Sequence, residues 1–149
     1  MSLFNKIDQV LARFGNMKAM QRTHVDTYTE CLIENVAGEQ YGISDYGELW
    51  ISYQELAGYY FINTSIISAT DIKTNKGASL EFLDSESKGV LVNSDDHMIE
   101  SDFSNVSNRW LTKINYCVDE DQLKFIQNKE YSLVKFKFKK AQLVFEIIK

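Results

Sequence analysis

Apolar and polar residues alternate along most of the chain from about residue 23 onward. The stretches GELWISYQ, GYYFINTSIISAT, ASLEFLDS and KGVLVNS are rich in β-branched and aromatic residues, which favour strands. Clusters of Gly, Asn, Asp and Ser separate them and predict turns. The segment THVDTYTECLIENV has a similar composition and is also predicted as a strand. We therefore expect about seven or eight short strands.

Residues 2–14 have a different pattern, in which apolar residues recur at helical spacing. Ser2 can cap the start of this predicted amphipathic helix, and Gly15 can end it. A helix this short is marginal in water, so we expect its apolar stripe to contact the protein's own sheet or a neighbouring subunit. The predicted interface residues are Leu3, Phe4, Ile7, Val10, Leu11 and Phe14.

The order of these elements predicts one mainly β domain over residues 1–149. Residues 1–22 form a leading helix and connector, and residues 23–149 form the β domain. A second, short helix is predicted near residues 119–128, where DEDQLKFIQNK interrupts the strands. A parallel α/β arrangement would need a helix after nearly every strand, and the sequence does not predict them. We predict an antiparallel β-sandwich, with a β-barrel as the alternative.

The basic segment YSLVKFKFKK raises the question of whether the protein binds nucleic acid. In a strand, Val134, Phe136 and Phe138 share one face, and Lys135, Lys137 and Lys139 share the other. Nucleic-acid-binding sheets typically place aromatic and basic residues on the same exposed face. The formal net charge of −5 also opposes general affinity for phosphates. We therefore interpret the lysines as the solvated face of an exposed edge strand and predict no nucleic-acid binding.

Cysteine usage and hydropathy bear on the location of the protein. Cys31 and Cys117 both lie in apolar, strand-like segments, which predicts two reduced, buried thiols. No run approaches the ~20 apolar residues that a membrane span needs, and the N-terminal residues lack the pattern of a secretion signal. We predict a cytoplasmic protein. Membrane binding by the leading helix is not expected, although bases accompany its stripe.

The stretch NSDDHMIESD, residues 93–102, is the densest group of titratable residues. Carboxylates beside an imidazole can bind a divalent metal or form an acid–base pair. The stretch has no HExxH spacing, no EF-hand order and no second histidine nearby. We predict a solvated acidic loop, with no metal site and no cofactor. A metal-dependent hydrolase is the alternative, and it would use Asp95, Asp96, His97, Glu100 and Asp102.

Two other features complete the functional prediction. GISDYG, residues 42–47, is predicted as a turn, because a nucleophile elbow needs glycine two residues after the serine. The aromatic residues of the middle strands could fill a core or line a pocket for a small molecule. The candidate ligand-binding residues are Trp50, Tyr53, Tyr59 and Tyr60.

We predict a non-catalytic binding or assembly module that associates with another protein or with itself. The alternative is a β-barrel carrier of a small apolar ligand.

Overall fold

The computed structural model describes residues 27–148, which form two helices and eleven strands. The predicted helix over residues 2–14 and its six interface residues lie outside the described residues. The elements in chain order are α2 (Tyr28–Glu34), β1 (Glu39–Ser44), β2 (Gly47–Leu56), β3 (Tyr59–Ser68), β4 (Lys73–Thr74), β5 (Ala78–Leu83), β6 (Gly89–Asn93), β7 (Ile99–Glu100), β8 (Asp102–Ser104), β9 (Arg109–Val118), α3 (Glu120–Gln127), β10 (Leu133–Phe138) and β11 (Ala141–Ile147).

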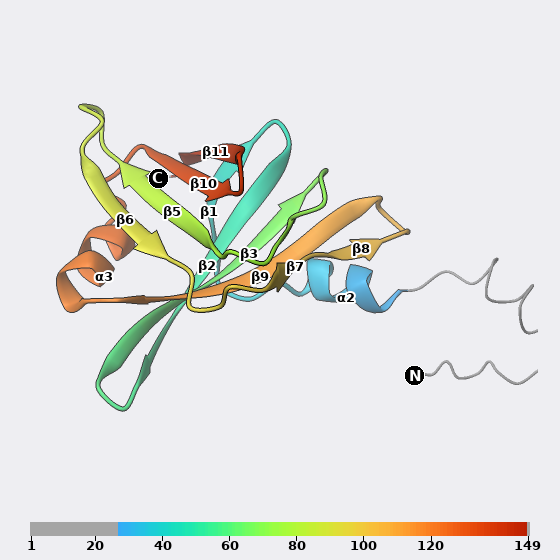
Figure 1. Ribbon diagram of the computed structural model, residues 1–149, viewed down its shortest axis with the longest axis horizontal. Helices are drawn as coiled ribbons and strands as arrows, with labels where there is room; N and C mark the ends of the chain where they lie inside the picture. Colours follow the sequence, from blue (N-terminus) through green and yellow to red (C-terminus); the bar gives the residue numbers. More distant parts are fainter. Residues whose placement is uncertain (1–26, 149) are drawn as a thin grey trace, which may run out of the picture.

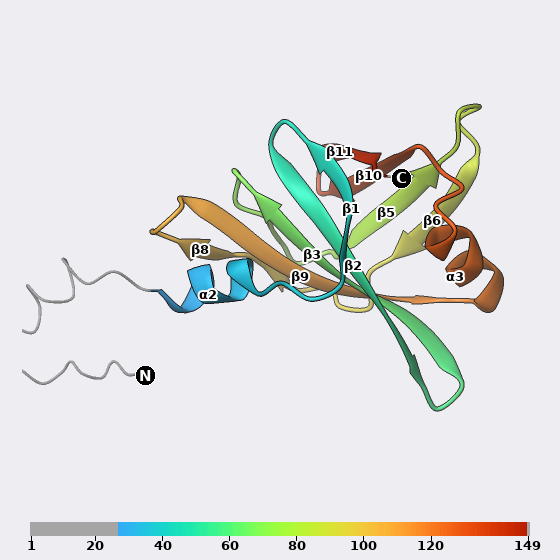
Figure 2. The same cartoon turned by 180° about the vertical axis from the view of Figure 1, so that it is seen from behind.

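Nine strands form one antiparallel sheet that curls into a half-barrel (Figures 1 and 2). Their order is β6-β5-β10-β11-β1-β2-β3-β9-β8, and β4 and β7 form a separate pair. The curl brings β6 back toward β9, where Ser94 bridges Tyr116 and the Asp95 N–H donates to the Asn115 carbonyl at 2.9 Å. The prediction of a mainly β, antiparallel fold is confirmed. No helix within residues 27–148 is long and apolar enough to cross a membrane.

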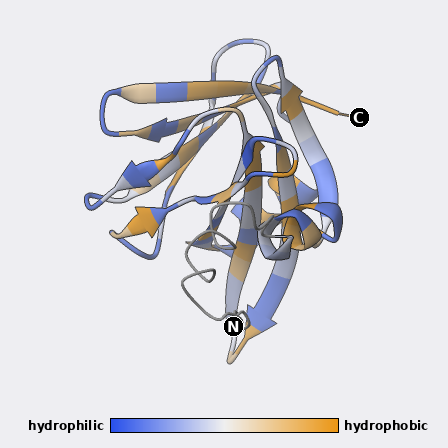
Figure 3. Ribbon diagram, turned by 90° about the vertical axis from the view of Figure 1, so that its right-hand side faces the viewer, coloured by the Kyte–Doolittle hydropathy of each residue, from blue (hydrophilic) through white to orange (hydrophobic). Residues whose placement is uncertain are grey.

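Alternation along the strands sends one set of side chains to the inner face of the curled sheet, where they form the main core. Figure 3 shows hydrophobic and hydrophilic residues following one another along the strands. In the hairpin of β5 and β6, Leu80 lies opposite Val92 and Phe82 lies opposite Val90. Fully burying each large apolar side chain contributes roughly 1.5–3 kcal/mol. The largest completely buried side chains are those of Tyr41, Tyr116, Phe82, Phe136 and Phe145.

Helix α3 confirms the short helix that the sequence predicted near residues 119–128. A capping box starts it: the Asp119 side chain accepts from the Gln122 N–H at 2.7 Å, and the Gln122 side chain accepts from the Asp119 N–H at 3.0 Å. Ile126 is buried in the core, and its carbonyl accepts a 2.8 Å hydrogen bond from the Tyr41 hydroxyl. Helix α3 therefore lies at the end of the half-barrel beside β6 (Figure 1).

The structure corrects the prediction for the segment around residue 30. Part of THVDTYTECLIENV forms α2, because Ile33 docks between Ile67 and Leu111 on the outer face of the sheet. This tertiary contact outweighs the weak local preference for a strand.

The prediction of buried cysteines is also wrong. Cys31 lies on the solvent side of α2, and Cys117 occupies an outward position of β9, so both are free and exposed.

Strand β10 keeps the predicted alternation but is not an edge strand. Val134 and Phe136 are buried on the inner face, whereas Lys137 is exposed on the outer face. The strand lies between β5 and β11 and pairs with both. The lysines therefore do not protect an edge. Lys137 instead forms a 3.2 Å ion pair with Glu81, and a partly exposed pair of this kind contributes about 0–1 kcal/mol.

Candidate functional site

The turn between β1 and β2 separates two hollows on the surface. It is a two-residue turn, Asp45–Tyr46, so the predicted turn at GISDYG is confirmed. A groove of about 480 Å³ lies on its β11 side, and we call it the β11 groove. A smaller hollow of about 290 Å³ lies on its β9 side, next to Arg109. The β11 groove is lined by Ile43, Ser44, Asp45, Tyr46, Leu133, Gln142, Leu143, Val144 and Glu146.

The β11 groove forms where β1 and β11 stop pairing. The two strands pair at Gly42 with Ile147 and at Ile43 with Glu146. Continuing this register would place Val144 opposite Asp45, but at Asp45 the chain already turns into β2. The other side of β11 stays paired with β10 along its whole length, to Ala141. Strand β11 therefore continues past the end of β1.

The backbone of β11 presents free hydrogen-bonding groups to this groove. The Ile147 N–H donates to Ser132 on the β10 side, whereas the Ile148 N–H donates to Tyr41 on the β1 side. Because these directions alternate along an antiparallel strand, the N–H and C=O groups of Gln142 and Val144 face the β1 side. Among residues 27–148, no strand pairs with that side of Gln142 and Val144. The groove thus contains a short open strand edge.

The lining of the β11 groove combines exposed apolar and acidic side chains. Ile43 is 45% exposed, Tyr46 66% and Val144 37%, and these three residues come from both sides of the groove. The charged lining residues are Asp45 and Glu146, and no Lys, Arg or His lines the groove in the described part of the chain. Exposed apolar side chains beside an unpaired strand edge are unfavourable in water unless a partner covers them.

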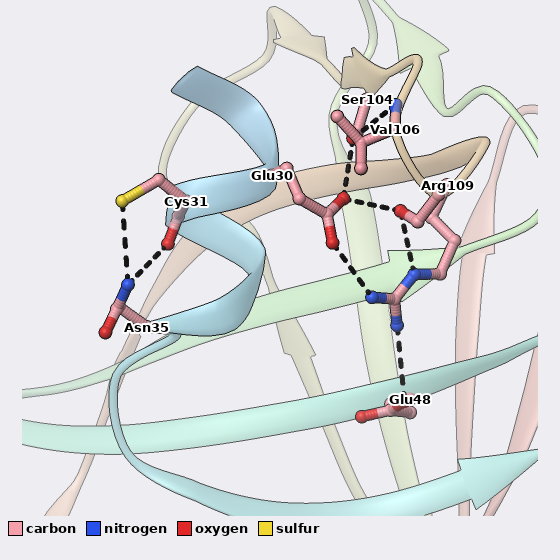
Figure 4. Close-up of polar contacts among 8 residues, drawn as sticks. Glu30, Cys31, Asn35, Glu48, Ser104, Val106 and Arg109 are labelled. Atoms are coloured by element: carbon pink, nitrogen blue, oxygen red, sulfur yellow. Dashed lines mark hydrogen bonds and ion pairs between the residues drawn. The ribbon is translucent and has the colours of Figure 1, made fainter. Parts of the chain in front are cut away.

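The hollow next to Arg109 borders a polar network that joins α2 to the sheet (Figure 4). Glu30 of α2 is 9% exposed, and its carboxylate accepts hydrogen bonds from the hydroxyls of Ser104 and Ser107, each at 2.6 Å. These two bonds, together with the Arg109 guanidinium, lower the pKa of Glu30 despite its partial desolvation. Arg109 lies between two carboxylates, 3.7 Å from Glu30 and 3.8 Å from Glu48.

Glu48 extends this network to the candidate residue Trp50. The Trp50 indole N–H donates to Glu48 at 2.9 Å, and the Gln40 amide donates to the same oxygen at 3.2 Å. The Trp50 ring packs on the cluster that holds Ile33 of α2. Because Glu30, Glu48 and Arg109 all have partners among the described residues, we assign this network to anchoring α2 and the β1–β2 hairpin.

The structure does not bring the four predicted ligand-binding residues together. Trp50 lies on the outer face with α2, whereas Tyr53 and Tyr60 lie on the inner face against the main core. Burial, reinforced by Glu39, raises the pKa of Tyr53 to about 12. Tyr59 is 64% exposed at the turn between β2 and β3. A role for any of these residues in ligand binding stays a prediction.

The acidic stretch 93–102 is spread over a loop and two short strands. The Asp95 side chain accepts from the Cys117 N–H at 3.1 Å, and Glu100 of β7 lies opposite Lys73 of β4. His97 is exposed, as are the four acidic residues of the stretch. Within residues 27–148, no three or more His, Cys, Asp or Glu side chains are grouped closely enough to hold a metal ion.

Sequence patterns predicted the turn at GISDYG but neither the β11 groove beside it nor the Glu30 network. One signal for the groove was present. In AQLVFEI the apolar residues Leu143, Val144 and Phe145 are consecutive, so one of them must face outward in a strand, and Val144 does. No local pattern links Glu30 to Ser104, Ser107 and Arg109, because the partners are more than seventy positions away in the sequence.

Comparisons of the chain with protein-family models, with curated proteins and with solved structures found no match. We therefore infer a function from the contacts and surfaces described above.

Proposed function

We propose that this protein is a non-catalytic binding module that holds an extended peptide segment of a partner protein in the β11 groove. The segment would lie beside β11 as an added strand, antiparallel to it and continuing the direction of β1. One observation carries the proposal: the backbone groups of Gln142 and Val144 face a groove in which no strand of the described residues pairs with them. Strand addition uses such an edge for affinity and the flanking side chains for specificity.

The energetics favour a modest affinity. Gln142 and Val144 offer two N–H and two C=O groups, and each hydrogen bond made in exchange for water contributes about 0.5–1.5 kcal/mol. Covering the exposed side chains of Ile43, Tyr46 and Val144 adds apolar burial. The loss of translational and conformational freedom on association offsets part of both terms. We therefore expect dissociation constants in roughly the micromolar range.

We also infer that the half-barrel is an incomplete barrel and not two packed sheets. A single sheet contains nine strands, and its first strand returns to β9 through the bridge between Ser94 and Tyr116. Within this curled sheet, β1 ends while β11 continues, which leaves room for one more strand beside β11. This opening is the β11 groove.

The proposed strand addition is tested by Val144→Pro, with Val144→Thr as its matched control. Proline removes the N–H that faces the groove and leaves the bonds to β10 intact, so the fold should persist. Peptides selected from a random display library on the wild-type protein should bind Val144→Pro at least tenfold more weakly and Val144→Thr about equally. Fluorescence anisotropy measures the affinity, and circular dichroism checks the fold.

Two results would contradict the proposal. The first is a folded Val144→Pro variant that binds the selected peptides as tightly as wild type. The second is a peptide-free dimer that Val144→Pro dissociates, because that result would assign the edge to a second copy of the chain. Sedimentation analysis of the free protein distinguishes a dimer from the monomer that we expect.

A further inference from the structure

We infer that the occupant of the β11 groove is an extended segment in which apolar residues alternate with Lys or Arg. This inference rests on the proposed function and specifies the chemistry of the partner. It follows from the side chains that each face of an added strand would meet.

An added strand would direct alternate side chains to the inner and outer faces of the sheet. On the inner side it would meet Leu143, which is half-buried and packs against the main core. An apolar side chain fits there, because a charged one would lose hydration without gaining a partner. Alternate positions of the partner are therefore apolar.

On the outer side the same strand would meet a mixed surface. Val144 and Ile43 are exposed there, and Asp45 and Glu146 line the same groove. Lys and Arg suit such a surface, because their aliphatic stems cover apolar area while their charged ends reach carboxylates. A Glu or Asp at these positions would face like charges.

The charges around the groove support a cationic partner. Lys135 and Lys137 lie opposite Val144 and Gln142 across the β10–β11 pair, and Lys137 forms an ion pair with Glu81. Arg109 lines the neighbouring hollow, and its guanidinium lies between Glu30 and Glu48. None of these three bases lines the groove, whereas Asp45 and Glu146 do. The formal net charge of −5 adds a long-range attraction for a basic segment.

The test uses three end-capped, fluorescently labelled octapeptides in which Val alternates with Lys, Thr or Glu. A fourth peptide is the Val–Lys sequence with alternate backbone nitrogens methylated, so that it cannot add as a strand. At low ionic strength we expect the Val–Lys peptide to bind about fivefold more tightly than Val–Thr, and Val–Glu to bind most weakly. The differences should shrink as salt is added.

A double variant that removes both carboxylates of the groove, Asp45→Asn with Glu146→Gln, tests whether these two residues cause the preference for the Val–Lys peptide. It should bind Val–Lys no more tightly than Val–Thr. The control variant Glu55→Gln removes an exposed charge near the β2–β3 turn and should preserve the preference for Val–Lys.

The outcomes separate this inference from the proposed function. If Val–Lys, Val–Thr and Val–Glu bind equally and methylation abolishes binding, the groove accepts a strand and the inference about charge is wrong. If the methylated peptide binds as well as its parent, the attraction is nonspecific adsorption to acidic surface, and the inference is overturned. If none of the peptides binds, both the inference and the proposed strand addition fail.

Discussion

Replacing Gly38 by alanine should destabilise the fold strongly, whereas the same change at Gly58 should have a small effect. Both glycines have a left-handed backbone, with φ of +91° at Gly38 and +84° at Gly58. An alanine in this conformation costs about 1 kcal/mol at either position. The two sites differ in the space that a Cβ atom would enter, so the pair separates steric overlap from backbone strain.

A Cβ atom on Gly38 would overlap the backbone carbonyl of Ile51 in β2, whereas one on Gly58 would meet no atom within 4 Å. Gly38 directly precedes Glu39, which pairs with Ile51, so the overlap can be relieved only by moving β1 away from β2. We expect Gly38→Ala to lower the free energy of unfolding by about 3–4 kcal/mol and Gly58→Ala by about 1 kcal/mol. Urea denaturation followed by circular dichroism measures both. Equal losses would show that β1 does not pack against β2 as described.

The second large effect concerns the dependence of stability on pH. Hydrogen bonds from Ser104 and Ser107, with the Arg109 charge, lower the pKa of Glu30 in the folded protein. A carboxyl whose folded pKa is lowered stabilises the fold above its unfolded pKa, and this contribution is lost as the pH falls through the folded value. Wild type should therefore be clearly more stable than Glu30→Gln at pH 7, and the difference should fall progressively below the ordinary glutamate pKa of about 4.3.

Thermal unfolding of wild type and Glu30→Gln between neutral pH and about pH 3 tests this linkage. Glu34→Gln is the matched control, because Glu34 is exposed on the same helix, and its melting curve should follow that of wild type. Loss of the Glu30 charge should also release α2, which increased proteolysis near residues 28–34 would report. Parallel pH profiles for wild type and Glu30→Gln would contradict a role for the ionised Glu30 in anchoring α2.

The sequence predicted what depends on local pattern. Alternation identified β2, β3, β5 and β6, and the break in the strand pattern at DEDQLKFIQNK identified α3, because each of these signals lies within a short segment. Prediction from the sequence failed where contacts between distant segments determine the structure. Helix α2 depends on docking of Ile33 and Glu30, and β10 is central because β5 and β11 lie on its two sides. Strands β4, β7 and β8 are too short to carry a recognisable period.

The candidate site was hidden from sequence analysis for the same reason. The β11 groove exists because β1 turns at Asp45 while β11, about a hundred residues later in the chain, continues to Ala141. No property of GISDYG or AQLVFEI alone indicates that the two segments are neighbours. Only the consecutive apolar residues at 143–145 gave a hint that an apolar side chain faces outward.

Amide hydrogen exchange along β11 tests the open strand edge most directly. In the free protein we expect the amides of Leu143 and Phe145 to exchange slowly, because they donate to β10, and those of Gln142 and Val144 to exchange quickly. Saturation with the Val–Lys octapeptide should then slow exchange at Gln142 and Val144 and leave Leu143 and Phe145 unchanged. If Gln142 and Val144 are already as protected as their neighbours in the free protein, or stay unprotected when the peptide is bound, β11 does not offer an edge for strand addition.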